Sequence, residues 1–322
     1  MLALRDYTVL IEKELERIDF PSSPSNLYDP LRYFLKIGGK RMRPILTLLG
    51  AEAFGIDKNK ALNAALAIEV FHNFSLIHDD IMDDAPLRRG QETVHEKWNN
   101  NIAILSGDVL LVKAYQLIAK NDHQSLPEIL DIFNRTAVEV CEGQQMDMDF
   151  ESRDNVSIDE YIEMIRLKTS VLLGCALETG AIVAGASKSD AKLIYEFGQQ
   201  IGIAFQIQDD ILDLYADPEK FGKQVGGDVI CNKKTLLLLK AFEIANETQT
   251  AQLNALLAEQ DLVLKVKAVR TLFDELGIRE ICKGIMNDHY NKAKLAMNQL
   301  SISEESKKPL LELAAYLMER EV

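Results

Sequence analysis

The stretch from His72 to Gly90 constrains this chain most strongly, because it places carboxylates within an apolar helix pattern. Asp79 and Asp83 are four residues apart, so a helix at 100° per residue puts both on one face. His72 falls on the same stripe, two turns earlier. Carboxylates on one face repel each other, and within an apolar segment they need a cation to be tolerated. A solvated acidic helix end is the alternative that a single cluster leaves open.

A second cluster repeats this spacing late in another long apolar helix pattern, at Asp209 and Asp213. Gln206 lies one turn before Asp209 on the same face. Two such clusters are hard to explain as solvated surface. If the two helix ends face each other, their carboxylates can hold divalent ions that also bind a diphosphate, since Mg²⁺ prefers carboxylates, waters and phosphate oxygens. Oxygen ligands without a Cys/His group favour Mg²⁺ or Mn²⁺ over zinc.

Helical periodicity accounts for most of the chain. Its 322 residues are 47% hydrophobic, which allows a large buried core. Only 7% are aromatic, and the abundant alanine, leucine, isoleucine, glutamate and lysine favour helices. We find no convincing alternating strand and no short repeat. The sequence therefore predicts one all-α domain over residues 1–322, with ten or more helices. The main expected helices cover residues 2–18, 45–54, 59–84, 103–120, 127–150 and 190–215.

Two shorter segments between these helices carry local signals. Ser157 and Glu160 form a capping-box pattern, which predicts the start of a helix that carries Lys168 and Thr169. Residues 171–184 are small and apolar, with two glycines and three alanines. Such a stretch indicates close helix packing in the interior.

Charge, cysteine content and hydropathy argue against several classes of protein. The net charge of -14 argues against a nucleic-acid partner, although a local basic cluster or a metal can still bind an anionic substrate. The four cysteines are far apart and form no CxxC pair, which indicates reduced thiols in a cytoplasmic protein. The first twenty residues are too acidic for a signal peptide. No run of 18 uncharged apolar residues occurs, so we expect no membrane span.

The motifs in this order resemble those of the trans-isoprenyl diphosphate synthases, the polyprenyl synthetase family. The resemblance runs over residues 38–233, and the length and helical tail extend it to nearly the whole chain. It implies one large helical bundle of the isoprenoid synthase type around a central cavity. The matching segments are GGKRMRP at 38–44, DDIMD at 79–83, RRG at 88–90, GQQMD at 143–147, KT at 168–169, FQIQDDILD at 205–213, and GKQVGGD at 222–228 with Lys233.

The resemblance implies a reaction between two diphosphates. An allylic diphosphate (dimethylallyl, geranyl or farnesyl diphosphate) ionises, and the double bond of isopentenyl diphosphate attacks the carbocation. It implies Mg²⁺ as cofactor, three ions per site, with Mn²⁺ as a possible substitute. It also implies a homodimer. The metal ligands would be Asp79, Asp83 and Asp209, with Asp80, Asp210 and Asp213 acting behind them or through water.

The same resemblance assigns the remaining site residues. Thr169 and Gln206 would turn acceptor dipoles towards the developing cation. The allylic diphosphate would bind to Arg88, Lys168, Lys223 and Lys233. The isopentenyl diphosphate would bind to Gly39, Lys40, Arg43, His72 and Arg89.

Product length is expected to depend on the flank of the helix beside the aspartates. On helical geometry Phe74 lies roughly 7.5 Å behind Asp79 along the axis, and Phe71 roughly 12 Å behind. Ser75, on the same flank, is too small to block a pocket. An aromatic residue at position 74, together with a DDIMD motif that has no insertion, resembles the pattern of synthases that make the C20 product. We therefore predict geranylgeranyl diphosphate as the main product, with farnesyl diphosphate as the next most favoured product. The alternative is that Phe74 belongs to the core and another element forms the floor.

Three other functions stay open on the sequence. A class I terpene cyclase shares the ionisation chemistry but normally lacks the second diphosphate site that GGKRMRP implies. A non-catalytic partner subunit of a heteromeric synthase typically loses aspartates from one motif, and this chain keeps both. A helical scaffold that only binds divalent ions would show no diphosphate-dependent stabilisation.

Overall fold

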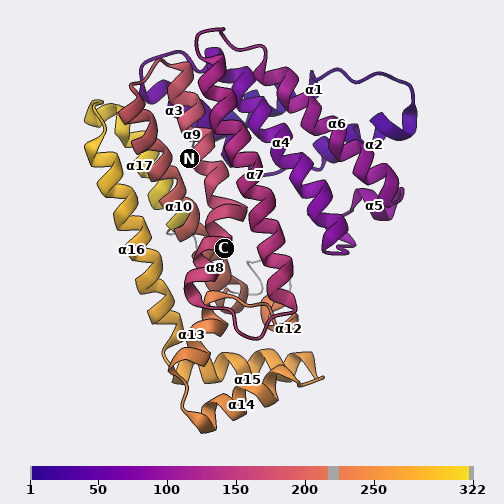
Figure 1. The fold of residues 1–322 in the computed structure, drawn as a ribbon, viewed down its shortest axis with the longest axis vertical. Helices are drawn as coiled ribbons and strands as arrows, with labels where there is room; N and C mark the ends of the chain where they lie inside the picture. Colours follow the sequence, from indigo (N-terminus) through magenta and orange to yellow (C-terminus); the bar gives the residue numbers. More distant parts are fainter. Residues whose placement is uncertain (1, 217–224, 319–322) are drawn as a thin grey trace. The chain divides into compact units, whose positions relative to one another are not determined.

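The computed structural model describes residues 2–216 and 225–318, and it is helical almost throughout, as predicted (Figure 1). Two compact units are resolved. Unit 1 comprises residues 1–135, 175–195 and 301–306, and unit 2 comprises residues 136–174, 196–300 and 307–322. Among the described residues, four helices have residues in both units: α7 (Leu126–Glu151), α9 (Val171–Val183), α10 (Lys188–Tyr215) and α17 (Glu304–Met318).

Unit 1 is built around the helix that carries the first aspartate cluster. This helix, α4 (Leu62–Met82), packs against α6 (Asn100–Ile118) and α3 (Met42–Ala53). The buried positions of α4 are mostly alanine and branched aliphatic residues. Gly50 of α3 lies so close to α9 that an added Cβ would be 2.6 Å from the carbonyl oxygen of Leu177. This confirms the close packing expected of residues 171–184. The helices are α1 (Leu2–Glu16), α2 (Ser25–Lys36), α3 (Met42–Ala53), η1 (Lys58–Ala61), α4 (Leu62–Met82), α5 (Val94–Lys97), α6 (Asn100–Ile118) and α9 (Val171–Val183).

One short hairpin departs from the strand-free expectation. Strands β1 (Leu87–Arg88) and β2 (Gln91–Glu92) pair antiparallel directly after the aspartate cluster. The two turn residues between them, Arg89 and Gly90, both have positive φ, which is the geometry that a two-residue hairpin requires. Strands of two residues are too short to leave an alternating pattern, so the sequence carried no signal for them.

Unit 2 has its core around the C-terminal half of α10. Helices α8 (Ile158–Ile165), α13 (Leu236–Ile244), α15 (Leu262–Glu275) and α16 (Ile278–Gln299) contribute apolar side chains to this core. Helices α14 (Glu247–Leu257) and α15 lie side by side in Figure 1. The predicted capping box at Ser157 and Glu160 forms and starts α8. The chain then continues as a π-helical turn, η2 (Arg166–Ser170), and α12 (Gly227–Ile230) is a single turn.

Candidate functional site

Arg43 and His72 meet in unit 1, where the sequence predicts an anion site. The guanidinium of Arg43 donates to His72 Nε2 across 3.0 Å, so the imidazole accepts at Nε2 and carries its proton on Nδ1. Burial, together with Arg43, Arg89, Arg88 and Arg41, lowers the pKa of His72 well below its usual value. His72 is therefore neutral at physiological pH, and the guanidinium groups around it carry the positive charge.

Gly39 and Arg89, both predicted to bind the same anion, also lie together. An added Cβ at Gly39 would be 2.6 Å from Arg89 Nη1, and Gly39 has φ of +150°. Burial and the neighbouring Arg41 lower the pKa of Arg89. Burial also lowers the pKa of Arg43 to about 10, despite the opposing charge of Glu69. Both side chains stay charged at neutral pH, and the repulsion between crowded cations favours binding of an anion. Lys40 is exposed on the same loop.

Arg41, inside the GGKRMRP motif, is a residue whose role the sequence did not reveal. It sits in the left-handed region with φ of 51°, yet only 4% of it is exposed. Its guanidinium forms a 2.6 Å ion pair with buried Glu69 of α4 and donates to the Leu35 carbonyl across 2.9 Å. Arg41 thus ties the basic loop to α4, the helix that carries His72 and Asp79.

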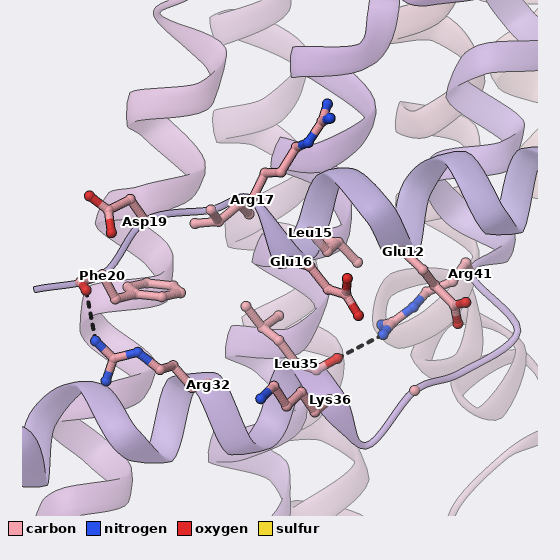
Figure 2. A pocket seen from close by; sticks show the side chains of 12 residues that line it. Glu12, Leu15, Glu16, Arg17, Asp19, Phe20, Arg32, Leu35, Lys36 and Arg41 are labelled. Atoms are coloured by element: carbon pink, nitrogen blue, oxygen red, sulfur yellow. Dashed lines mark hydrogen bonds between the residues drawn. The ribbon is translucent and has the colours of Figure 1, made fainter. Parts of the chain in front are cut away.

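A pocket of about 740 Å³, with Arg41 in its lining, lies between α1 and α2. Figure 2 shows Arg41 donating to the Leu35 carbonyl, with Glu12 and Glu16 of α1 nearby. The lining of this pocket contains both acidic and basic side chains and includes none of the predicted diphosphate-binding residues. This pocket therefore does not coincide with the predicted substrate-binding residues.

The first aspartate cluster divides into two kinds of side chain. Asp79 is partly buried and Asp83 is exposed at the end of α4, so both can reach a ligand. Asp80 is 1% exposed and binds Arg88: Arg88 Nε donates to its two oxygens across 2.8 and 2.9 Å. Asp80 therefore holds Arg88 in place, and its expected role behind the metal ligands stays a prediction.

One other group of side chains in unit 1 could chelate a metal. Asp84, His95 and Glu96 each bring one ligand atom within 4.8 Å of the others. Asp84 and Glu96 are exposed, and solvated carboxylates often cluster without a metal. Among the residues that the structure describes, the predicted pair Asp79 and Asp83 does not form such a three-residue group. A metal ion bound there would take further ligands from substrate and water.

In unit 2, Lys168 and Lys233 share the carboxylate of Asp147. Lys168 Nζ lies 2.5 Å and Lys233 Nζ lies 3.8 Å from Asp147 Oδ2. Burial would raise the pKa of Asp147, but Lys233 and Lys168 outweigh it, and the pKa lies below its usual value. Gly143 allows this approach, because a Cβ there would collide with the Lys168 backbone nitrogen. The GQQMD motif thus supports Lys168 by position and by charge.

A chain of hydrogen bonds runs behind the second aspartate cluster. Thr169 Oγ1 donates to Gln206 Oε1 across 3.2 Å, and Gln206 Nε2 donates to Asp210 Oδ1 across 3.2 Å. The hydroxyl of Tyr161 donates to Asp210 Oδ2. Lys168 and Thr169 lie in the π-helical turn η2, a local geometry that is frequent at functional sites. The sequence predicted Thr169, Gln206 and Asp210 but gave no signal for Tyr161.

Asp213 and Asp228 are linked through the backbone. Asp213 Oδ2 accepts from the Asp228 amide across 3.0 Å, so Asp213 orders the turn that follows residues 217–224. Burial and the charge of Asp213 raise the pKa of Asp228 to about 6. Burial and Asp228 raise the pKa of Asp210 to about 7. Sequence reasoning missed Asp228 as a site residue, although it ends the GKQVGGD motif. Predicted Lys223 lies outside the described residues.

The three predicted chain-length residues have different surroundings in unit 1. Phe71 is 1% exposed and packs edge-on against Phe133, with ring centroids 5.1 Å apart. Phe74 is partly exposed and its ring lies between those of Phe71 (tilted, centroids 5.6 Å apart) and His78 (edge-on, 4.7 Å). Ser75 is partly exposed, and its hydroxyl donates to the His72 carbonyl across 2.9 Å. Phe71 therefore belongs to the core, whereas Phe74 can meet a ligand.

Comparison with known proteins gives a consistent result. The polyprenyl synthetase family model matches residues 24–276. A short chain isoprenyl diphosphate synthase from Methanothermobacter thermautotrophicus is 39% identical, over 99% of this chain and 98% of the relative. A geranylgeranyl pyrophosphate synthase from Geoglobus acetivorans is 40% identical, over 99% and 98%. A crystal structure of a geranylgeranyl pyrophosphate synthase superposes with a TM-score of 0.94 at 46% identity, covering 98% of both chains.

Proposed function

The chain belongs to the polyprenyl synthetase family and is a short-chain trans-prenyltransferase; we propose that it joins isopentenyl diphosphate head-to-tail to an allylic diphosphate. The observation that carries this reaction is the basic cluster around neutral His72, formed by Arg43 and Arg89. It offers an anion site separate from the aspartates. A terpene cyclase does not need such a site, and the comparisons support neither a cyclase nor a silent partner subunit.

The allylic diphosphate is the group that we assign to the aspartate motifs. Asp79, Asp83 and Asp209 would hold Mg²⁺, three ions per site, and carboxylates of this kind also accept Mn²⁺. Bound Mg²⁺ supplies neutralisation of the diphosphate as a leaving group. Arg88, Lys168 and Lys233 bind its oxygens, and Lys223 does so from the GKQVGGD segment. Support comes from Asp80 and Asp147, which hold Arg88 and Lys168 by direct ion pairs.

The carbon–carbon bond forms after ionisation. The allylic C–O bond breaks, and the diphosphate leaves with the electron pair. Thr169 and Gln206 direct acceptor dipoles at the cation. The C3–C4 double bond of isopentenyl diphosphate, held by Gly39, Lys40, Arg43, His72 and Arg89, attacks the allylic C1. A proton then leaves C2, and the released diphosphate accepts it. The product is five carbons longer and still allylic.

Product length, assembly and location complete the proposal. Phe74 limits the growing chain, so geranylgeranyl diphosphate is the main product, with farnesyl diphosphate next. The homodimer is supported by an apolar stripe on α6, where exposed side chains cover about 100° of the helix surface. Helix α6 is long and apolar enough to cross a membrane by length and composition alone, and a single such helix is weak evidence for a membrane span. We place the enzyme in the cytoplasm as a single domain. The exposed apolar residues of the stripe are Ile104, Leu105, Val112 and Tyr115.

One experiment tests the reaction and the product together. The purified chain is incubated with Mg²⁺, isopentenyl diphosphate and, separately, C5, C10 or C15 allylic starters, and the products are sized by mass spectrometry. We expect each starter to be extended and the C20 diphosphate to accumulate. Products that contain no isopentenyl carbon would overturn the prenyltransferase assignment. A main product of another length would overturn only the prediction of geranylgeranyl diphosphate.

A further inference from the structure

Tyr161 is a buried side chain that the proposed reaction does not yet use. It lies on α8, in the first turn after the capping box, and only 2% of it is exposed. Its ring packs within the apolar core of unit 2, but its hydroxyl turns to the carboxylate of Asp210. A phenylalanine would fill the same core volume. The hydroxyl therefore has a purpose other than packing.

The hydrogen bonds from Tyr161 lead step by step to the residues that face the cation. Tyr161 occupies Oδ2 of Asp210, which leaves Oδ1 as the acceptor for Gln206. Gln206 Nε2 donates to Asp210 Oδ1, and the ionised form of Asp210, which only accepts hydrogen bonds, keeps the NH₂ end of the amide on this side. The opposite end is then the carbonyl oxygen, Oε1. One of its lone pairs takes the proton of Thr169, and the other is available to an electron-poor carbon.

Without the Tyr161 hydroxyl, the Asp210 carboxylate loses the hydrogen bond that fixes it, and the orientation of the Gln206 amide is no longer fixed in turn. Gln206 Oε1 and Nε2 differ only in chemistry, and the amide can rotate by half a turn about its last bond. A free Asp210 carboxylate could turn away from Gln206 and leave the amide to choose either face. An NH₂ group directed at a developing carbocation would oppose ionisation, whereas a carbonyl oxygen favours it.

We propose that Tyr161 is a positioning residue for the ionisation step, acting through Asp210 to keep the carbonyl oxygen of Gln206 directed at the allylic cation. This inference rests on the proposed function, because it takes the cation to form beside Thr169 and Gln206. Because only 2% of Tyr161 is exposed, we expect it to contact neither substrate nor metal. Its effect should therefore appear in the rate of ionisation and not in the binding of either diphosphate.

The test compares Tyr161→Phe with Tyr215→Phe, which also removes a buried hydroxyl from the core of unit 2. We expect Tyr161→Phe to lower kcat about 10–100-fold, the loss of one hydrogen bond to a charged group, with both KM values changed less than about 3-fold. Tyr215→Phe should leave kcat within about 2-fold. Equal effects of the two variants would overturn the proposal, because they would indicate a general packing role.

Two further measurements separate positioning from stability and from the reaction itself. An allylic analogue with an ammonium nitrogen at the cationic carbon should bind Tyr161→Phe about 10-fold more weakly, while a neutral thiolodiphosphate analogue binds equally well. Adding Tyr161→Phe to Gln206→Ala should cost little more than Gln206→Ala alone. Additive losses, or equal weakening of both analogues, would overturn the role of Tyr161. A wild-type chain that consumes no isopentenyl diphosphate would instead overturn the proposed function.

Discussion

Arg43 donates a hydrogen bond to His72 Nε2 across 3.0 Å, and this contact requires a neutral imidazole. His72 then serves as a spacer that holds Arg43 in place without adding a charge of its own. The cations of the cluster are guanidinium groups, which bind diphosphate oxygens in fixed fork geometry. The sequence alone could place His72 beside the aspartates but could not tell which protonation state it takes.

The neutral state of His72 predicts a specific loss of stability in acid. The folded pKa lies well below the unfolded value of about 6.5, so the unfolded chain binds the extra proton and stability falls as pH decreases through 6.5. Between pH 7.5 and 5.5 the wild type should lose about 1.4 kcal/mol that His72→Gln does not lose. Urea denaturation of both proteins at the two pH values measures the difference. Parallel pH profiles would contradict a neutral His72.

Replacement of Glu69 by glutamine should strongly destabilise the protein. The change leaves the buried guanidinium of Arg41 without its counter-charge, which costs about 3–5 kcal/mol in folding free energy. The double variant Arg41→Met with Glu69→Leu should regain most of that stability, because it buries no charge. Its KM for isopentenyl diphosphate should nevertheless stay about 10-fold or more above wild type, since the loop is no longer tied to α4. A normal KM in the double variant would show that the tie is structural only.

Loss of the Asp147 charge should weaken the binding of the allylic diphosphate. In Asp147→Asn, Lys168 and Lys233 lose the carboxylate that holds them, so the KM for the allylic substrate should rise about 10-fold while that for isopentenyl diphosphate stays constant. Steady-state kinetics with each substrate varied in turn gives both values. Asp149→Asn, an exposed carboxylate on the same helix, is the matched control and should behave as wild type.

Phe74 and Phe71 should respond differently to truncation. Phe74→Ala opens the partly exposed flank of α4, so the main product should lengthen by one or more five-carbon units, as read by mass spectrometry. Phe71→Ala should instead cost about 3–5 kcal/mol of stability, because its ring packs in the core against Phe133. A longer product from Phe71→Ala alone would reverse these assignments.

A charge on the apolar stripe of α6 should disrupt the homodimer. Leu105 is 58% exposed, and Leu105→Glu would bury a carboxylate in the contact between two copies. Light scattering after size-exclusion chromatography should show a shift from dimer to monomer. Val263→Glu adds the same charge at an exposed valine of α15 in unit 2 and should leave the dimer intact. A monomeric wild type would rule out the dimer itself.

The sequence by itself determined the helical class and the family, whereas the roles of the motif residues stay predictions. Periodicity marked α4 and α10, because the burial of one helix face leaves a regular spacing in the chain. The capping box at Ser157 was equally local, and the structure confirms it. The predicted helix boundaries differ by a few residues from those in the structure: the segment expected as one helix over 59–84 begins with the 3₁₀ turn η1 and ends at Met82.

Only the tertiary structure decided how the site side chains are supported. Arg41 forms an ion pair with Glu69, Lys168 forms one with Asp147, and Tyr161 donates a hydrogen bond to Asp210. In each pair the partners are more than twenty residues apart in the sequence. The separation of core Phe71 from partly exposed Phe74 is of the same kind. Such pairs depend on which helices pack together, and helix packing leaves no periodic signal that links the two partners. Residue types and spacing therefore determine the chemistry, whereas protonation states and orientations follow from the contacts that the fold creates.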